Sequence, residues 1–176
     1  MMYHKAMLFS DPSVAAQILS SSHPRKVRAL GRKVSNFADV VWNAHREAIV
    51  RRGNMLKFTR PVDATRDGRW IVPLEVERKD GTVTEERSLR ELLLGTGEEE
   101  LVEASPFDRI WGIGYGADKA SKVQRERWGM NLLGKALMAV RAELRKELAE
   151  GESGTGAVDE KKTDVSEGTK EGKESG

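Results

Sequence analysis

The chain has 176 residues, and its 30 lysines and arginines nearly balance its 28 aspartates and glutamates, for a formal net charge of +2. Acidic and basic residues alternate along almost the whole sequence, which argues against a dedicated duplex-binding protein, because such proteins concentrate positive charge on one face or helix. The absence of cysteine excludes disulfide bonds and thiolate metal sites.

Three short helices are expected at the start of the chain. Residues 1–9 read as the later part of a helix. A second helix begins within SDPSVAAQILSS, with Ser10 or Asp11 as its N-cap and Pro12 in the first turn, where the missing N–H costs nothing. Pro24 opens a short basic helix that Gly31 is expected to end.

A longer helix follows, beginning at Asn36 or at Ala38-Asp39 and reaching a break near Gly53. The apolar spacing predicts an inner face made of small and branched side chains: Val40, Val41, Ala44, Ala48 and Ile49. Trp42 lies on this helix among valines, where a tryptophan is ordinarily a core residue.

From residue 69 to residue 87 apolar and polar residues alternate, which is the pattern of a strand and not of a helix. Asp80-Gly81 lies within this stretch and is a strong hairpin signal. Pro73 favours an edge strand. Ser88 is then expected to cap a short helix that ends at Gly95 and Gly97, and residues 101–104 to form a strand. The last predicted helix spans residues 131–148, with an apolar stripe of Leu132, Leu133, Ala136, Leu137, Val140 and Leu144.

These elements predict an α+β fold, a mainly helical single domain over residues 1–150 with a small antiparallel sheet and a β-hairpin insertion at about residues 59–87. Residues 151–176 contain many glycines and charges but no aromatic side chain, so they are expected to form a disordered tail. No apolar run approaches the roughly 18 residues of a membrane span, so the chain is expected to be soluble and cytoplasmic.

The stretch LVEASPFDRIWGIGYG, residues 101–116, is the leading candidate for a ligand site. Glu103 would share a strand face with Leu101 and be partly buried, and buried acids are often functional. Asp108 beside Arg109 is either a surface ion pair or a site acid. Trp111 could form the floor of a pocket.

The glycines at 112–116 lack the spacing and the βαβ context of a dinucleotide-binding loop, so they are expected to permit a tight turn or close approach to a ligand. Asn131 opens the last helix and would serve as its N-cap. Lys57 is either a snorkelling lysine beside the core ring of Phe58 or a cation on the phosphate side of a site. His4, His23 and His45 show no metal-ligand spacing.

Several motifs occur in an order that resembles the NADAR family. They are YHKAMLF at 3–9, LGRKV at 30–34, Trp42 followed by Arg46, Ile49-Val50, Gly53-Asn54 and Lys57-Phe58, LLLGTGEEELVEASPFDRIWGIG at 92–114, and WGMNLLGKALMAVR at 128–141. The resemblance covers most of residues 1–148 and is interrupted at about residues 59–87.

This resemblance implies hydrolysis of an N-glycosidic bond between a base-like amine and a phosphorylated ribose or ADP-ribose, as in family members that act on riboflavin-synthesis intermediates or on ADP-ribosylated guanine. The expected partner is a phosphoribosyl or ADP-ribosyl small molecule, with ADP-ribosylated nucleic acid as a further possible substrate. No cofactor, metal or membrane is implied. The transition state resembles an oxocarbenium ion, so the site needs a carboxylate, an aromatic face and cations for phosphate.

By position in the family's motifs, Asp108 and Glu103 are implied as catalytic acids. The implied substrate-binding residues are Trp42, Trp111, Asn131, Lys5, Arg32 and Lys57. One departure is that the family places a catalytic glutamate, and before it a strand segment, just ahead of the residues equivalent to Met1. The chain as given is therefore expected to be impaired in cleavage, and the alternative function is binding of ADP-ribose or a related nucleotide.

Overall fold

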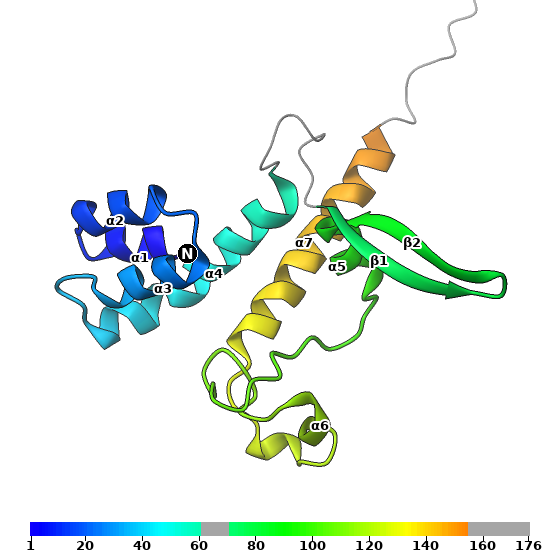
Figure 1. Ribbon diagram of the computed structural model, residues 1–176. Helices are drawn as coiled ribbons and strands as arrows, with labels where there is room; N and C mark the ends of the chain where they lie inside the picture. The colour runs from blue at the N-terminus through cyan, green and yellow to red at the C-terminus, as the bar shows by residue number, and fades with distance from the viewer. Residues whose placement is uncertain (61–70, 155–176) are drawn as a thin grey trace, which may run out of the picture.

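The computed structural model describes residues 1–60 and 71–154, the last four as backbone only. Four helices occupy the first segment: α1 (Met2–Leu8), α2 (Pro12–Leu19), α3 (Pro24–Arg32) and α4 (Asp39–Thr59). The second segment contains β1 (Ile71–Arg78), β2 (Gly81–Ser88), α5 (Leu89–Gly95), α6 (Ala117–Ala120), the 3-10 turn η2 (Arg125–Arg127) and α7 (Leu132–Gly154) (Figure 1). The expected mainly helical α+β fold with a small antiparallel sheet is confirmed.

Asp11 determines where α2 begins. One carboxylate oxygen accepts a hydrogen bond from the Val14 amide at 3.0 Å, which is the N-cap geometry, and the other accepts from the Ser35 amide at 2.9 Å. These two amide donors, Ser35 foremost, hold the pKa of the Asp11 carboxyl below its ordinary value. Asp11 thus decides between the two predicted caps and also ties α2 to the segment that follows α3.

The prediction that Gly31 ends the basic helix is wrong, because α3 continues through it to Arg32. Gly31 is instead a contact point between helices. A Cβ atom at this position would lie 2.3 Å from the sulfur of Met2, so a larger residue would require the Met2 side chain to move. The absence of a side chain at Gly31 therefore lets Met2 pack between α1 and α3 in this position.

The predicted inner face of α4 is also wrong. Of its five residues only Ile49 is partly buried, while Val40, Val41, Ala44 and Ala48 are exposed. The helix also runs through Gly53 without a break. The buried residues of α4 are Arg46 and Val50, with Trp42 partly buried one turn earlier. The stripe at positions 42, 46 and 50 contains an arginine, so a search for apolar periodicity selects the opposite side of the helix.

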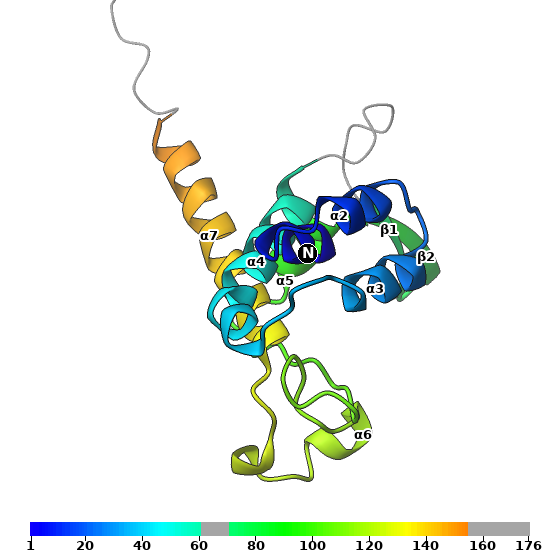
Figure 2. The same ribbon diagram turned by 90° about the vertical axis from the view of Figure 1, so that its left-hand side faces the viewer.

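α4 lies between the group formed by α1, α2 and α3 and the helix α7 (Figures 1 and 2). Two hydrophobic clusters hold these helices together. The first joins α1, α2 and α3 through the buried residues Ala6, Phe9, Ala15, Ile18, Leu30 and Val34. The second joins α5 and α7 through Leu93, Val140 and Leu144, with Met55 and Phe58 of α4 packed against it. The predicted stripe of the last helix is confirmed, and α7 extends beyond the predicted end to Gly154.

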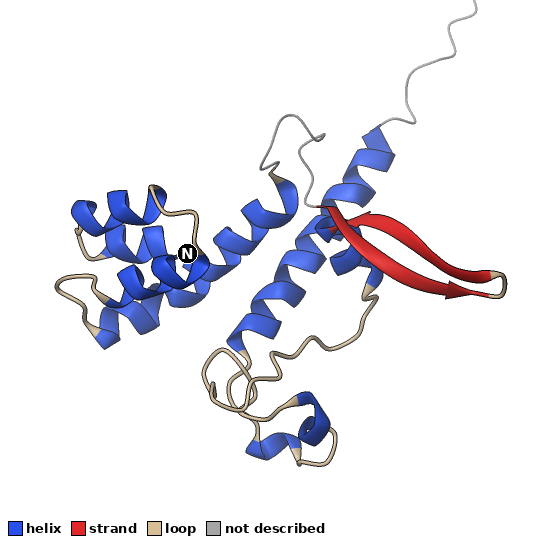
Figure 3. Cartoon of the chain, in the orientation of Figure 1, coloured by secondary structure: helices blue, strands red, loops and turns tan. Residues whose placement is uncertain are grey.

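The hairpin forms where it was predicted. β1 pairs with β2 in antiparallel register, from Ile71 opposite Ser88 to Arg78 opposite Gly81, and it projects from the α5 side of the helices (Figure 3). The Ser88 side chain and Glu91 then form a capping box that starts α5. The beginning of the predicted insertion at residues 61–70 and most of the predicted tail, residues 155–176, lie outside the described residues.

Residues 101–104 do not form the predicted strand, since no strand in the described part of the chain pairs with them. The segment is held by a side chain instead, as the site geometry shows below. No helix in the described ranges is both long enough and apolar enough to cross a membrane.

Candidate active site

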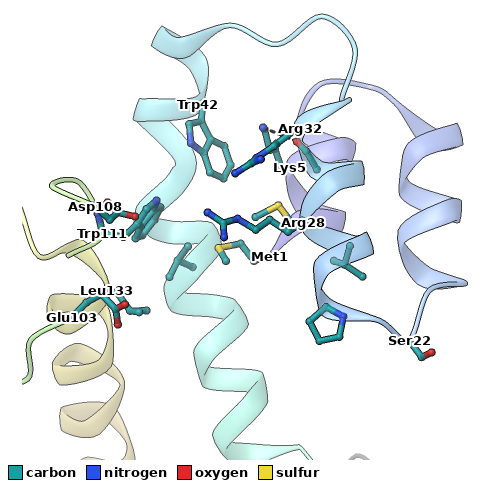
Figure 4. A pocket seen from close by; sticks show the side chains of 15 residues that line it. Met1, Lys5, Ser22, Arg28, Arg32, Trp42, Glu103, Asp108, Trp111 and Leu133 are labelled. Carbon is teal, nitrogen blue, oxygen red and sulfur yellow. Dashed lines mark hydrogen bonds between the residues drawn. The ribbon is translucent and has the colours of Figure 1, made fainter. Parts of the chain in front are cut away.

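A cavity of about 720 Å³ lies between the N-terminal helices, α4 and the loop that precedes α6 (Figure 4). Besides Ser22, its polar and aromatic lining comes from three parts of the chain: Lys5, Arg28 and Arg32 from α1 and α3, Trp42 from α4, and Glu103, Asp108 and Trp111 from the loop. Cations therefore gather on one wall and carboxylates on the other.

The cationic wall is formed by α1 and α3. None of Lys5, Arg28 and Arg32 takes part in an ion pair within the described residues. The two arginines are exposed and are one helical turn apart. Their charges are therefore available to an anionic ligand.

Lys5 is more fixed than the two arginines. Its Nζ donates to the Gly31 carbonyl oxygen at 2.8 Å and lies 4.2 Å from the centre of the Phe37 ring and 5.6 Å from that of Trp42. Burial lowers the pKa of Lys5, and the nearby charge of Asp39 partly opposes this. Cation–π contacts and one carbonyl thus position the ammonium at the edge of the cavity.

The acidic wall begins with Asp108. Its Oδ1 accepts hydrogen bonds from the amides of Ile110 at 2.9 Å and Trp111 at 2.8 Å, which fixes the side chain in a local turn. The other carboxylate oxygen has no hydrogen-bond partner in the described residues. Asp108 and Arg109 form no ion pair within the described residues, and the Arg109 guanidinium instead donates to the Arg127 carbonyl at 2.8 Å.

Glu103 is positioned through its backbone by Asn131. The Glu103 amide donates to Asn131 Oδ1 at 3.0 Å, and Asn131 Nδ2 donates to the Leu101 carbonyl at 2.9 Å. The asparagine side chain thus satisfies the two backbone groups that a neighbouring strand would satisfy. The half-buried Glu103 side chain lines the cavity and has no polar partner in the described residues.

Gly112 lets the backbone of the loop fold onto itself. A Cβ atom at Gly112 would lie 2.6 Å from the Glu103 carbonyl oxygen and 2.9 Å from that of Asp108. Gly114 has φ +79°, a conformation that glycine adopts without strain. The glycine-rich run therefore provides a tight turn and close contact with the chain's own backbone beneath both acids.

The loop also rests on the start of α7. Five consecutive amides, those of residues 129–133, donate to carbonyl oxygens in residues 109–113. The amides of Leu132 and Leu133 belong to the first turn of α7 and find acceptors at Ile110 and Trp111. The segment that carries Asp108 and Trp111 is thereby fixed to a long helix.

Two indoles complete the site. Trp42 contacts the first hydrophobic cluster and also lines the cavity, so its side chain belongs to both. Trp111 lines the cavity beside Asp108 (Figure 4). Together the indoles provide flat apolar surface between the cationic and acidic walls.

The structure brings together six of the eight predicted site residues and separates the other two. Asn131 is buried behind Glu103 and does not line the cavity, while exposed Lys57 lines a different hollow beside Phe58 and Arg60. Sequence reasoning missed Arg28. Its position one helical turn before Arg32 is the signal that could have revealed it.

This arrangement suits one class of ligand. An anionic group would be held by the cations, a planar group would contact an indole, and a developing positive charge would be stabilised by the two carboxylates. In the described ranges no group of three or more histidine, aspartate or glutamate side chains could hold a metal ion.

The sequence of this chain is similar to known proteins. Residues 1–145 match the NADAR domain. N-glycosidase R617 of Acanthamoeba polyphaga mimivirus is 39% identical over 144 residues, which cover 81% of this chain and 70% of that protein. N-glycosidase Npun_R5314 of Nostoc punctiforme is 31% identical over 150 residues, 84% of this chain and 74% of its own length. Protein irg-1 of Caenorhabditis elegans is 34% identical over 146 residues, 81% of this chain and 57% of that protein.

Proposed function

We propose that this chain, which belongs to the NADAR family, is an N-glycosidase that hydrolyses the bond between a base-like amine and a phosphorylated ribose or ADP-ribose. Two relatives named N-glycosidase, at 39% and 31% identity, support a hydrolase of this kind. The observation that carries the proposal is the meeting of two carboxylates, two indoles and three cations in one cavity.

Hydrolysis of an N-glycoside builds positive charge on the ribose ring as the bond to the base lengthens. A carboxylate beside the ring stabilises that charge or accepts a proton from the attacking water. Asp108 is our candidate for this role, because its turn fixes one oxygen and leaves the other without a partner in the described residues. Glu103 is the second acid and would assist proton transfer.

The remaining lining residues would hold the substrate. Lys5, Arg28 and Arg32 would bind phosphate oxygens, since charge-assisted hydrogen bonds to phosphate are among the strongest in proteins. Trp111 and Trp42 would contact the base or the sugar. Because the cations and the acids lie on opposite walls, the phosphate would be kept away from the carboxylates.

The direct test is turnover. The protein should be incubated separately with a phosphoribosylamino-pyrimidine, with free ADP-ribosylated guanosine and with ADP-ribosylated guanine in an oligonucleotide, and the released base or ADP-ribose measured by chromatography. Release from at least one substrate at any measurable rate supports the enzymatic proposal, and the identity of that substrate defines the substrate class. Failure to turn over all three would remove the enzymatic proposal.

A second candidate is binding of ADP-ribose or a related nucleotide without cleavage. It is favoured by the composition of the cavity, in which the indoles and cations would hold a nucleotide whether or not the acids act. Calorimetry with ADP-ribose, comparing the natural chain with Trp111→Ala, tests it. Measurable binding that the substitution weakens supports this function, and equal or undetectable binding in both proteins would end it.

A further inference from the structure

Arg46 is a buried cation with a poor set of partners. It is 9% exposed, and it forms no ion pair within the described residues. One nitrogen donates to Asn43 Oδ1 at 2.7 Å, another lies 3.8 Å from the thioether sulfur of Met130, and Nε is buried with no acceptor among the residues that the structure describes. A buried guanidinium ordinarily has a carboxylate or several oxygen acceptors.

Arg141 shows how the same fold buries an arginine with adequate partners. It is 4% exposed and also has no carboxylate partner in the described part of the chain, but it donates to Thr96 Oγ1 at 2.6 Å and to the Glu99 carbonyl at 2.9 Å. These bonds anchor the segment after α5 to α7. Thus burial of an arginine is not unusual in this protein, whereas the incomplete pairing of Arg46 is.

The position of Arg46 connects two walls of the cavity. Trp42 and Val50 precede and follow it by one turn on α4, and both line the cavity. Met130 lies in the 129–133 segment, whose amides bind the carbonyls of residues 109–113 beneath Asp108 and Trp111. The next residue, Asn131, holds the backbone of Glu103. The Arg46 side chain therefore extends from the face of α4 that carries Trp42 to the 129–133 segment, which supports both acids.

We propose that Arg46 is a positioning residue that holds the 129–133 segment against α4 and thereby places Asp108, Glu103 and Trp111 opposite Trp42. The proposal rests on the proposed function in one respect, because placing these three side chains opposite Trp42 affects the reaction rate only if the cavity is an active site. A buried charge with an unpaired N–H costs stability, so its role here is to fix geometry. Misplacing reacting groups by about 1 Å can cost roughly 100-fold in rate.

Two matched substitutions test this. Arg46→Met replaces the unpaired charge with an apolar side chain, so the Tm should hold or rise, while kcat should fall by about 100-fold with KM within roughly threefold. Arg141→Met leaves the Thr96 hydroxyl and the Glu99 carbonyl without their donor, so its Tm should fall. Its kcat, measured well below that Tm, should stay within about threefold of the natural value. A purely structural role for Arg46 predicts instead that both variants lose Tm and retain kcat.

Hydrogen exchange measured by mass spectrometry gives a readout that needs no turnover. Arg46→Met should speed exchange in residues 129–133 by about tenfold or more, whereas Arg141→Met should leave this segment unchanged. If the natural chain cleaves no substrate, the proposed function fails and exchange alone decides the role of Arg46. An Arg46→Met protein with natural exchange in this segment, or with natural kcat where the parent is active, overturns the proposal.

Discussion

Asn131 and Glu103 are joined by a hydrogen bond from the Glu103 amide to the Asn131 side-chain oxygen at 3.0 Å, and the same carboxamide donates to the carbonyl of Leu101. Both ends of the carboxamide are therefore used by backbone groups, so Asn131 supports a cavity residue from behind. Its own φ of 51° lies in the left-handed region, where asparagine is better tolerated than most residues. Asparagine therefore suits this position both in its backbone conformation and in its side chain.

Replacing Asn131 with alanine should destabilise the protein by about 1–3 kcal/mol, because two partly buried backbone groups lose their partners. It should also lower hydrolysis, because Glu103 is no longer fixed. Urea unfolding and the turnover assay measure the two effects. Asn36→Ala is the matched control, since Asn36 also has a positive φ, of 54°, but is exposed. Equal losses in the two variants would show that backbone conformation, rather than the clamp on Glu103, is what matters.

Gly112→Ala should be among the most damaging substitutions in the loop. The new methyl group would lie within 3 Å of two carbonyl oxygens, those of Glu103 and Asp108, and the backbone beneath both acids would have to move. We expect a loss of about 2–4 kcal/mol in unfolding free energy, measured by urea titration. Gly95→Ala, where a methyl group meets nothing within 4 Å, should change stability by no more than about 1 kcal/mol. A Gly112→Ala protein as stable as Gly95→Ala contradicts the close approach.

The carboxylates are best tested by isosteric amides. Asp108→Asn preserves an oxygen that can accept from the Ile110 and Trp111 amides, so the turn should survive while the charge is lost. Glu103→Gln likewise changes charge but little volume. We expect kcat to fall by roughly 100- to 10,000-fold for the more important acid, with Tm close to that of the parent.

Glu99→Gln is the matched control for these two variants. Glu99 is an exposed acid that lies four residues before Glu103 and does not line the cavity. It should retain full activity under the same assay conditions. If all three amide variants keep full activity, the acids of this wall are not the catalytic ones.

Locally encoded features were predictable from the sequence. Helix caps and tight turns depend on residues within a few positions of one another, so the sequence alone can predict them. This holds for the caps at Asp11 and Ser88 and for the turn at Asp80-Gly81. The buried face of α4 was not predictable in this way. It contains Arg46, whose burial depends on packing against the start of α7, and a charged residue is normally assigned to solvent.

The site shows the same division. Glu103 is partly buried as predicted, but the reason is different, because a side chain distant in sequence replaces the expected neighbouring strand. The resemblance to the family's motifs implied Asn131 as a site residue, but it did not reveal that the Asn131 side chain holds the backbone of Leu101 and Glu103. Arg28 was missed because no motif includes it, and only the helical spacing to Arg32 places it on the cavity wall. Long-range contacts therefore decide which residues contact a ligand and which support those residues.

The pH dependence of stability should contain a contribution from Asp11. Its folded-state pKa is lowered by the amides of Ser35 and Val14, so the stabilisation is complete above the ordinary carboxyl pKa and is lost as the pH falls through the lowered value. Asp11→Ala should therefore be less stable than the natural chain at pH 7, and the difference should shrink in acid. Urea unfolding from pH 7 downward measures this. A difference that stays constant with pH would show that the side chain stabilises the protein without its charge.

The cationic wall should control affinity for phosphorylated ligands. Arg28→Ala and Arg32→Ala each remove a charge that has no ion-pair partner in the described part of the chain, so neither should affect folding greatly. Loss of one charge-assisted hydrogen bond to phosphate corresponds to about 10- to 100-fold in Kd for ADP-ribose. Calorimetry at two salt concentrations measures the effect.

Arg25→Ala is the matched control for this wall. Arg25 lies on the same helix and is exposed, but it does not line the cavity, so a general charge effect would include it whereas a phosphate contact would not. We expect Arg25→Ala to stay within about threefold of the natural affinity at moderate salt, because it removes no direct contact with the phosphate and salt screens the remaining attraction of an exposed charge. If all three arginine variants weaken binding equally, and the loss disappears at high salt, α3 acts only through its overall charge. If Arg28→Ala and Arg32→Ala alone weaken binding, and part of the loss persists at high salt, these two residues contact the phosphate directly.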